Sequence, residues 1–386
     1  MKILHCCLSC FYIDDYGYQE NILPKIHKSQ GHDVRIVAST ETYIENKEIG
    51  YTEPKDYMNE DNILVSRIPY SNWIPSLINK KIRLYNGLEK NLNSFKPDII
   101  FLHEFQFLSA LDIIEYKKKN PNVKIYVDGH TDLINSGKNW ISKNILHGIF
   151  YKWIAQKIEK YVTKFYGTLP LRKKFMIDVY KIPKEKVELL PFGVDDSNID
   201  FSQRSIISKT LREKMGFNDD DFVIISGGKI DIRKNIINLM EAIRELNHKN
   251  VKLLVFGSTN DDTNDDVLRL SKYANIKYIS WINYKEIYQY FFASDLAVFP
   301  GTHSVIWEEA VGLGIPCIFK RWDGIDHIDL GGNCAFIDEG TKDIILNKIN
   351  EIYSDTNYFT SMKISAQKSR GHFKYSQIAK KAINHE

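Results

Sequence analysis

The sequence predicts an α/β protein with two domains, each built around a parallel β-sheet. The first observation behind this prediction is the length of 386 residues, which is enough for two domains of about 150–200 residues. The second is that short apolar runs alternate with helical segments along the chain, a pattern typical of βαβ units. The third is a globular composition of 43% hydrophobic and 26% charged residues, without any apolar run of the ~20 residues that a transmembrane helix needs.

In the first half of the chain, six apolar runs are predicted to be strands. They span residues 2–7, 33–38, 63–68, 98–103, 123–127 and 165–168. The opening run is expected to be a strand rather than a signal peptide, because its apolar core is short and no small-residue cleavage site follows. Helices are predicted in between, over residues 22–31, 72–95, 108–119 and 139–165. The segment 139–165 is expected to form one or two helices whose apolar stripe packs on the sheet, and the polar segment 41–61 is expected to form an irregular loop.

The strand predicted at 123–127 ends in the polar run Asp128-Gly129-His130-Thr131-Asp132. In open α/β sheets, ligands bind outside the carboxyl ends of the strands, so His130 is a candidate ligand-binding residue. The alternative interpretation is that His130 and Asp132 only cap the turn after the strand.

The second half of the chain repeats the alternation after a linker predicted at 188–200. Strands are predicted at 222–226, 251–257 and 277–282 and on both sides of a helix within 296–319. Further helices are predicted from about Ser208, after Asn235, and over residues 284–293, 341–354 and 375 onwards.

The segment Leu296–Phe319 predicts a strand, a tight Gly-Thr-His-Ser loop, a helix and a second strand. Ser304 is the expected N-cap of the helix, whose free N–H groups would suit a phosphate. Glu309, one turn into the helix, would accept hydrogen bonds from hydroxyl groups such as those of a ribose. The alternative is an ordinary crossover helix with solvated glutamates.

The segment Val223–Leu239 predicts a strand, the pair Gly227-Gly228, a basic loop and a helix with Asn235 as its N-cap. The glycines allow close approach of a ligand to the backbone, and Lys229 and Lys234 provide the cations that a diphosphate needs. The alternative is a basic turn on a solvated face, because the segment contains neither a Walker loop nor GxGxxG.

Together these two segments resemble glycosyltransferase family 4. That family carries G-R-x-x-x-x-K, with Lys229 here at the Arg position and Lys234 at the Lys position. It also carries E-x7-E, whose second Glu falls on Glu309, whereas Gly301 stands at the position of the first. The resemblance extends to Gly314-Ile315-Pro316 and, more loosely, to most of the chain.

This resemblance implies the GT-B fold, with two Rossmann-like domains whose parallel sheets face a central cleft. The implied domains are an acceptor-binding domain at 1–192, a nucleotide-sugar-binding domain at 193–372, and a C-terminal helix at 373–386 that crosses back to the first domain. The implied catalytic residues are His130, Lys229, Lys234 and Glu309. The implied nucleotide-sugar-binding residues are Gly17, Gly228, Lys229, Lys234, Trp281, Ile282, Thr302, His303, Ser304, Val305 and Glu309.

The implied activity is that of a retaining glycosyltransferase in surface polysaccharide synthesis. Its expected donor is a UDP-sugar, its acceptor a saccharide or lipid-linked saccharide, and neither a cofactor nor a metal is expected. The alternative is a catalytically silent relative that binds a sugar nucleotide or a partner. An oxidoreductase is disfavoured because no glycine lies between Cys6 and Asp15, and nothing in the sequence suggests the pyridoxal lysine of a phosphorylase.

Net charge is only +3, so nucleic acid is not an expected partner, but the charge is unevenly distributed. Twelve basic residues lie between Lys138 and Lys186, opposed by only Glu159, Asp178 and Glu185. This excess favours contact with an acidic membrane surface. The five cysteines lack zinc-site spacing and are expected to be reduced thiols. The expected location is therefore the cytoplasm, with peripheral contact to the inner face of the cell membrane.

Overall fold

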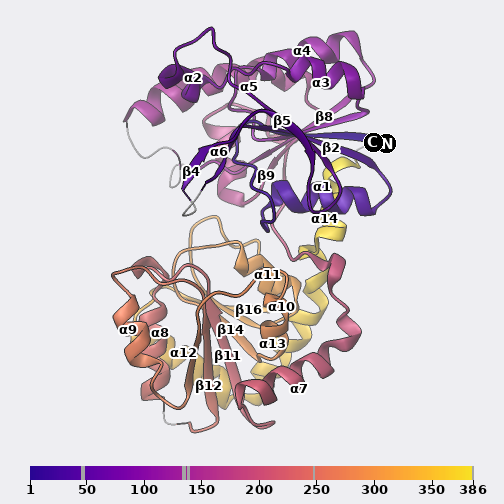
Figure 1. The fold of residues 1–386 in the computed structure, drawn as a ribbon. Helices are drawn as coiled ribbons and strands as arrows, with labels where there is room; N and C mark the ends of the chain where they lie inside the picture. Colours follow the sequence, from indigo (N-terminus) through magenta and orange to yellow (C-terminus); the bar gives the residue numbers. More distant parts are fainter. Residues whose placement is uncertain (45–47, 133–135, 137–139, 247, 385–386) are drawn as a thin grey trace. The chain divides into compact units, whose positions relative to one another are not determined.

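The computed structural model describes residues 1–44, 48–132, 136, 140–246 and 248–384, and the chain folds into two compact units (Figure 1). Unit 1 comprises Met1–Pro191 and Ile378–Glu386, and unit 2 comprises Phe192–Gln377. The C-terminal helix α14 (Tyr375–Ile383) therefore starts in unit 2 and continues into unit 1.

Unit 1 is built on an eight-stranded sheet in the order β10-β9-β8-β7-β1-β2-β6-β5. Neighbouring strands are parallel except for β5, which pairs antiparallel with β6 at the edge. The strands are β1 (Lys2–Cys7), β2 (Asp33–Ser39), β5 (Lys55–Met58), β6 (Leu64–Ile68), β7 (Ile99–His103), β8 (Lys124–Gly129), β9 (Lys164–Gly167) and β10 (Val187–Leu189).

Helices cover both faces of this sheet, and for that reason its central strands are almost continuously apolar. The helices are α1 (Gln19–Ser29), α2 (Ser76–Ile82), α3 (Leu88–Phe95), α4 (Ala110–Lys119), the π-helix η2 (Ile141–Tyr151), α5 (Lys152–Ile158) and α6 (Pro170–Asp178). The helices α3, α4, α5 and α6 pack into one apolar core with the sheet. On the other face, α14 is held by the hydroxyls of Tyr126 and Tyr166, which donate to its carbonyls at Ile383 and Lys381, both at 3.1 Å.

Two predictions for unit 1 are wrong. The segment predicted as an irregular loop contains β5 and the antiparallel pair β3 (Glu41–Tyr43) and β4 (Ile49–Tyr51). The helix predicted over 72–95 is two helices, because Arg83 at the end of α2 adopts a left-handed conformation (φ 55°) and the chain restarts after Gly87 (φ 103°).

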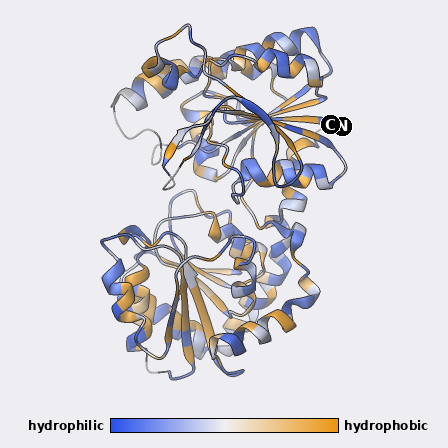
Figure 2. Cartoon of the chain, in the orientation of Figure 1, coloured by the Kyte–Doolittle hydropathy of each residue, from blue (hydrophilic) through white to orange (hydrophobic). Residues whose placement is uncertain are grey.

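Unit 2 is built on a six-stranded, fully parallel sheet in the order β13-β12-β11-β14-β15-β16. The strands are β11 (Phe222–Gly227), β12 (Val251–Phe256), β13 (Ile276–Ile279), β14 (Leu296–Phe299), β15 (Cys317–Lys320) and β16 (Cys334–Ile337). The helices are α7 (Arg204–Met215), α8 (Ile236–Glu245), α9 (Asn264–Leu270), α10 (Ile287–Phe292), α11 (Ile306–Gly312), α12 (Lys342–Ser354) and α13 (Thr356–Ser369). Figure 2 shows apolar strands enclosed by helices that are polar on their outer sides.

The strand order of unit 2 reverses between β11 and β14. The chain leaves β11 toward the β12 side of the sheet and leaves β14 toward the β15 side. The two connections therefore run in opposite directions from the carboxyl ends of neighbouring strands. Open α/β sheets bind ligands at such a place. This reversal places the loops of residues 228–235 and 300–305 next to each other.

Candidate active site

The two loops at the strand reversal of unit 2 are joined by direct hydrogen bonds. The Thr302 backbone N–H donates to the Arg233 carbonyl at 3.0 Å. The Lys234 ammonium donates to the carbonyls of Thr302 at 2.8 Å and His303 at 3.1 Å. Lys234 thus fixes the conformation of the β14 loop and also brings a cation to it.

Gly301 lies at the closest approach of these loops. A Cβ atom at Gly301 would lie 2.3 Å from the Arg233 carbonyl oxygen and 2.4 Å from backbone atoms of Lys234. The glutamate of the E-x7-E pattern therefore does not fit at this position unless the β11 loop moves. The close packing of the two loops is therefore compatible with glycine, and not with glutamate, at position 301.

Gly228 and Lys229 follow β11 directly. Gly228 has a φ of +108° and open space where a Cβ would be, so the backbone here is accessible. The Lys229 side chain is exposed, and its ammonium has no ion-pair partner in the described part of the chain. Arg233, in contrast, pairs with Asp231 at 2.6 Å. Lys229 is thus a cation available to a ligand.

Lys234 lies in a partly desolvated position. Burial lowers the pKa of Lys234 to about 8, although Asp231 opposes the shift. A negatively charged ligand would stabilise the ammonium form and raise this pKa. Binding of such a ligand would therefore be coupled to proton uptake near pH 8.

The expected cap of α11 is wrong. The helix begins at Ile306 with Val305 at the N-cap position, and no side chain caps it. The Ser304 carbonyl accepts a bond from the Trp307 N–H instead. Within the described residues, the backbone N–H groups of His303, Ser304 and Val305 donate to no protein acceptor. Consecutive free N–H groups of this kind are suited to binding an anion.

Asn235 does occupy the N-cap position of α8, but without a capping side-chain bond. Its side-chain amide donates instead to the Pro300 carbonyl at 3.0 Å. Asn235 therefore contributes a fourth hydrogen bond between the β11 and β14 loops.

Glu308 and Glu309 are neighbours in opposite environments. Glu308 is fully buried, and burial would raise its pKa, but hydrogen bonds from His303 and His327 outweigh this and lower the pKa to about 2. Burial, with a contribution from Asp195, raises the pKa of Glu309 to about 8. The Glu309 carboxyl has no hydrogen-bond partner among the described residues. Glu309 therefore carries a half-buried carboxyl whose surroundings favour the protonated form, a group expected at a ligand site rather than in a structural network.

The remaining predicted donor residues of unit 2 are Trp281 and Ile282. They follow β13, which ends at Ile279, so the strand predicted to reach Ile282 is shorter than expected. Trp281 is exposed by 64%, whereas Ile282 is buried in the core. Their place beside a nucleotide base stays a prediction.

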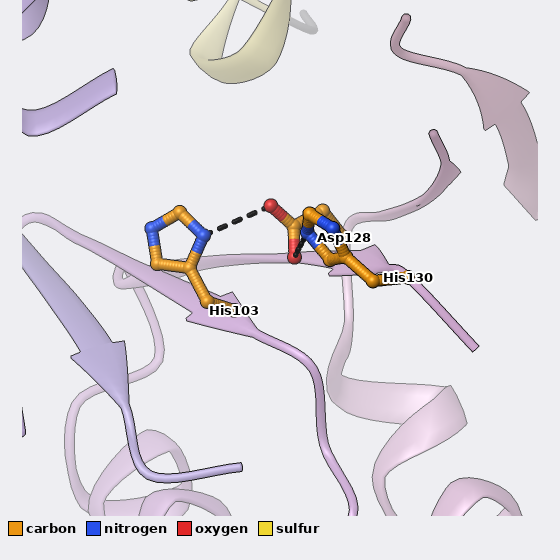
Figure 3. Close-up of side chains that lie close together, drawn as sticks. All are labelled: His103, Asp128 and His130. Atoms are coloured by element: carbon orange, nitrogen blue, oxygen red, sulfur yellow. Dashed lines mark hydrogen bonds and ion pairs between the residues drawn. The ribbon is translucent and has the colours of Figure 1, made fainter. Parts of the chain in front are cut away.

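In unit 1, His130 lies directly after β8 and contacts a buried carboxylate (Figure 3). Its Nε2 lies 3.2 Å from Asp128 Oδ1, and the other oxygen of Asp128 lies 2.9 Å from His103 Nδ1. Burial would lower the pKa of His130, but the Asp128 carboxylate outweighs it and raises this pKa. The ligand atoms of these three residues lie within 4.8 Å of one another, a donor set that could hold a metal, and here they engage one another.

Glu104, which the sequence reasoning missed, supports the turn that carries His130. The Glu104 carboxylate accepts the His130 backbone N–H at 2.5 Å and the Thr131 hydroxyl at 2.9 Å. Glu104 has a left-handed backbone (φ 66°), a strained conformation for a non-glycine residue. The only sequence signal for it was its place just after an apolar strand.

Gly17 lies in the loop between β1 and α1, between Tyr16 and Tyr18, whose rings stack at 5.2 Å. Tyr16 also meets Tyr43 edge-on at 5.4 Å. The structure therefore joins Lys234 to the loop 302–305 within unit 2. Lys229 lies in the loop after β11, Glu309 lies in the helix after the 302–305 loop, and His130 and Gly17 lie after strands of unit 1.

Comparison with known proteins indicates the class of enzyme. Residues 207–369 match the family described as glycosyl transferases group 1. The chain is 24% identical over 312 residues to alpha-monoglucosyldiacylglycerol synthase of Acholeplasma laidlawii, covering 76% of this chain and 74% of that protein. The protein is therefore an enzyme of the glycosyltransferase class.

Solved structures show the same fold at low sequence identity. Anabaena Alr3699/HepE in complex with UDP superposes with a TM-score of 0.67 at 16% identity, over 99% of this chain and 98% of that one. Sucrose-phosphate synthase of Thermosynechococcus elongatus gives a TM-score of 0.67 at 13% identity, over 98% and 96% of the two chains. The fold is GT-B, with two Rossmann-like domains, as the resemblance implied.

Proposed function

We propose that the protein transfers a sugar, with retention of anomeric configuration, from a UDP-sugar to a saccharide or lipid-linked saccharide in surface polysaccharide synthesis. The observation that carries this proposal is the strand reversal of unit 2, where Lys234 ties the β11 and β14 loops together. Beside it lie the unpaired Lys229 and the free N–H groups of residues 303–305. Cations and N–H groups in this arrangement are complementary to a diphosphate.

The proposed chemistry is electrostatic. When the glycosidic bond to the donor breaks, negative charge grows on the leaving diphosphate, and Lys229, Lys234 and the 303–305 amides would stabilise it. Preorganised donors of this kind commonly provide the largest part of catalysis. Glu309 would bind ribose hydroxyls, and His130 would position the sugar. No step of this scheme needs a metal or another cofactor, and none is proposed.

A UDP-sugar is the proposed donor because Alr3699/HepE has been solved with UDP and with UDP-glucose. Trp281 and Ile282, at the end of β13, remain the proposed contacts of the uracil base. The silent-relative alternative is supported by Gly301, which lacks the glutamate of the pattern. Hydrolysis of the donor in the absence of an acceptor would distinguish the two proposals.

A membrane surface is the proposed environment of the acceptor, and exposed apolar side chains support it. The stripe that was expected to pack as core is buried only in part, at positions such as Ile154 and Ile158. Four further members of the stripe and part of the α2 region are exposed. This membrane patch consists of Trp73 (90% exposed), Leu77 (82%), Ile78 (54%), Trp140 (69%), Ile145 (44%), Ile149 (65%) and Trp153 (40%).

The two parts of the membrane patch are neighbours in unit 1. The Tyr151 hydroxyl at the end of η2 donates to the Lys81 carbonyl in α2 at 2.6 Å. In η2, bonds run from residue i to i+5, so side chains four and five positions apart share a face. Trp140, Ile145 and Ile149 have this spacing.

The positive charges around the membrane patch are complementary to an anionic lipid surface. Lys80, Lys81 and Lys143 are exposed within it, and cations flanking aromatic and aliphatic side chains are typical of interfacial membrane contacts. The wider basic run contributes less than expected, because Lys164, Arg172 and Lys186 are paired with acidic residues. Lys138 lies outside the described residues.

The lipid-linked acceptor has a proposed entry beside this patch. An open groove of about 730 Å³ is lined by Tyr51, Tyr70, Trp73 and Lys80, among others. Aromatic rings and a cation at the edge of an apolar surface suit a sugar headgroup whose lipid stays in the bilayer. The relative in Acholeplasma laidlawii is named for a glucosyl lipid product, which favours a lipid-based acceptor. Among the described residues, no helix combines the length and apolarity needed to cross a membrane.

The direct test is incubation with UDP-glucose and other UDP-sugars in the presence of anionic vesicles that contain lipid-linked saccharides. The expected result is release of UDP and a new glycolipid whose anomeric proton, observed by NMR, shows the configuration of the donor. Glu309→Gln is expected to reduce this rate, with Leu268→Ser on the surface of unit 2 as a control. UDP release without any glycolipid would restrict the enzyme to donor hydrolysis, and an inverted anomer would overturn the retaining mechanism.

A further inference from the structure

A row of buried histidines crosses unit 1 and ends at His130. It starts at the Ala379 carbonyl in α14, which lies 2.9 Å from His27 Nε2 in α1. His27 Nδ1 lies 3.1 Å from His5 Nε2 in β1, and His5 Nδ1 lies 3.0 Å from His103 Nε2 in β7. His103 Nδ1 then contacts Asp128 in β8, which also contacts His130 (Figure 3).

The protons in this row can be counted. The carbonyl of Ala379 at one end and the carboxylate of Asp128 at the other are both acceptors. The four contacts between them each need one proton to be a hydrogen bond. Three neutral imidazoles carry only three N–H groups. The fully bonded row must therefore hold one proton more than three neutral histidines provide.

We infer that this excess proton resides on His103, as a buried imidazolium paired with the Asp128 carboxylate. With His103 donating from both nitrogens, every other ring has one defined form: His5 and His27 are each neutral and each donate from Nε2. In each of the four contacts, one N–H group then faces one acceptor atom. The pair is compensated internally, which makes its burial tolerable.

The environments of the other members support this placement. Burial, followed by repulsion from the neighbouring rings, lowers the pKa of His5 well below its usual value. Burial lowers the pKa of His27 to about 4, despite its bond to the Ala379 carbonyl. Burial alone would raise the pKa of Asp128, yet His103 and His130 outweigh it and lower this pKa. Neutral rings at one end and a carboxylate at the other leave His103 as the site of the proton.

Other ionisable groups face the row and belong to its electrostatics. Glu20 of α1 and Arg172 of α6 act on His130 with opposite signs. Glu104, in the turn after β7, lies within range of both His130 and Asp128. The thiols of Cys7 and Cys10 lie within range of Asp128 and are kept protonated by their surroundings. None of these groups replaces the bond between His103 and Asp128.

The consequence for the active site is that His103 and Asp128 are positioning residues. Asp128 Oδ1 lies 3.2 Å from His130 Nε2, so the carboxylate charge attracts this ring and raises its pKa. A neutral Asp128 would lose this hold on His130. This consequence rests on the proposed function of His130 in sugar transfer, whereas the proton count does not.

The test is 15N NMR of the full chain labelled at histidine, which distinguishes an imidazolium from each neutral tautomer. At pH 7–8 we expect His103 to be doubly protonated and His5 and His27 to be neutral with the proton on Nε2. Signals are assigned with His103→Gln and His5→Gln, and His248→Gln in unit 2 serves as the control. A neutral His103 in the wild-type chain would overturn the proposal.

Two further arms sharpen this test. Added zinc is expected to leave the His103 signals unchanged; binding of one zinc with loss of the His103 Nδ1 proton would overturn the proposal in favour of a metal site. In Asp128→Asn, the pKa of His130 is expected to fall by about one unit or more, and an unchanged His130 titration would refute the positioning role. Because these readouts need no turnover, absence of sugar transfer together with a charged His103 would contradict only the proposed function.

Discussion

In the folded protein, the surroundings of Glu309 oppose the ionisation of its carboxyl group. Burial and Asp195 raise the pKa of Glu309 to about 8, from about 4.3 in an unfolded chain. The folded state therefore binds this proton more tightly than the unfolded state does. Its contribution to stability is fully present below pH 4.3 and is lost as the pH rises through 8.

Glu309→Gln is accordingly expected to become more stable relative to wild type as the pH rises from 5 to 9. The expected change in the difference in unfolding free energy is about 1–3 kcal/mol, measured by urea denaturation at a series of pH values. Glu308→Gln is the matched control with the opposite sign. Because the pKa of Glu308 is lowered to about 2, this variant should be less stable at neutral pH and approach wild type as the pH falls toward 2. A flat pH response of Glu309→Gln would contradict the assigned environment.

Residue identity at the site was only partly predictable from the sequence. Lys229, Lys234 and Glu309 stood at recognisable spacings beside strand ends. Asp128 and His103 did not, because their role depends on His5 and on contacts between β1, β7 and β8. The contact of His27 with Ala379 joins residues 352 positions apart, and no local pattern encodes such a contact.

At the scale of elements, the contact between the β11 and β14 loops depends on the absence of a side chain at Gly301. Gly301→Ala is expected to reduce stability by about 2–3 kcal/mol, because its Cβ would meet backbone atoms at 2.3–2.4 Å. UDP affinity should fall with it, since the same contact places Lys234. Gly371→Ala is the control, because nothing lies within 4 Å of its added Cβ. Equal stability of the two variants, measured by urea denaturation, would show that the loops are not in close contact.

The exposed side chains of α2 and η2 predict binding to anionic vesicles. Replacing Trp73 and Leu77 by Ser removes two exposed apolar anchors, each worth about 1.5–3 kcal/mol if fully buried in the lipid. We expect vesicle partitioning, measured by co-sedimentation, to fall more than tenfold. The control is the pair Ile206→Ser and Leu268→Ser, which removes exposed apolar groups from unit 2. Equal loss in both double variants would argue against a specific membrane patch.

Elements with one strong signal were predicted well, and those with competing signals were not. The apolar strands β1, β7 and β11 were evident because parallel strands buried on both faces are continuously apolar. Part of the apolar stripe was correctly predicted as core, but the members that are exposed in η2 were not distinguished from it, since a periodic apolar face looks alike whether it is buried or exposed. The edge strand β5 was missed because its sequence, Lys55–Met58, is mostly polar.

At the scale of the whole chain, the alternation of strands and helices was enough to predict two parallel α/β sheets. The strand order was not, because it depends on which strands pair rather than on where strands lie. The reversal of strand order between β11 and β14 is therefore seen only in the structure. It explains why two motifs about 70 residues apart meet at one site.

The central claim is that unit 2 binds a nucleoside diphosphate through Lys234 and the loops that it joins. Calorimetric titration of the full chain with UDP, GDP and ADP tests this claim most directly, with Lys234→Ala compared to wild type and Lys252→Ala as a lysine control on β12. We expect UDP to bind, Lys234→Ala to weaken this binding by about 1.5–3 kcal/mol, and Lys252→Ala to leave it unchanged. Failure of all three nucleotides to bind wild type, or equal UDP affinity in Lys234→Ala, would contradict this claim.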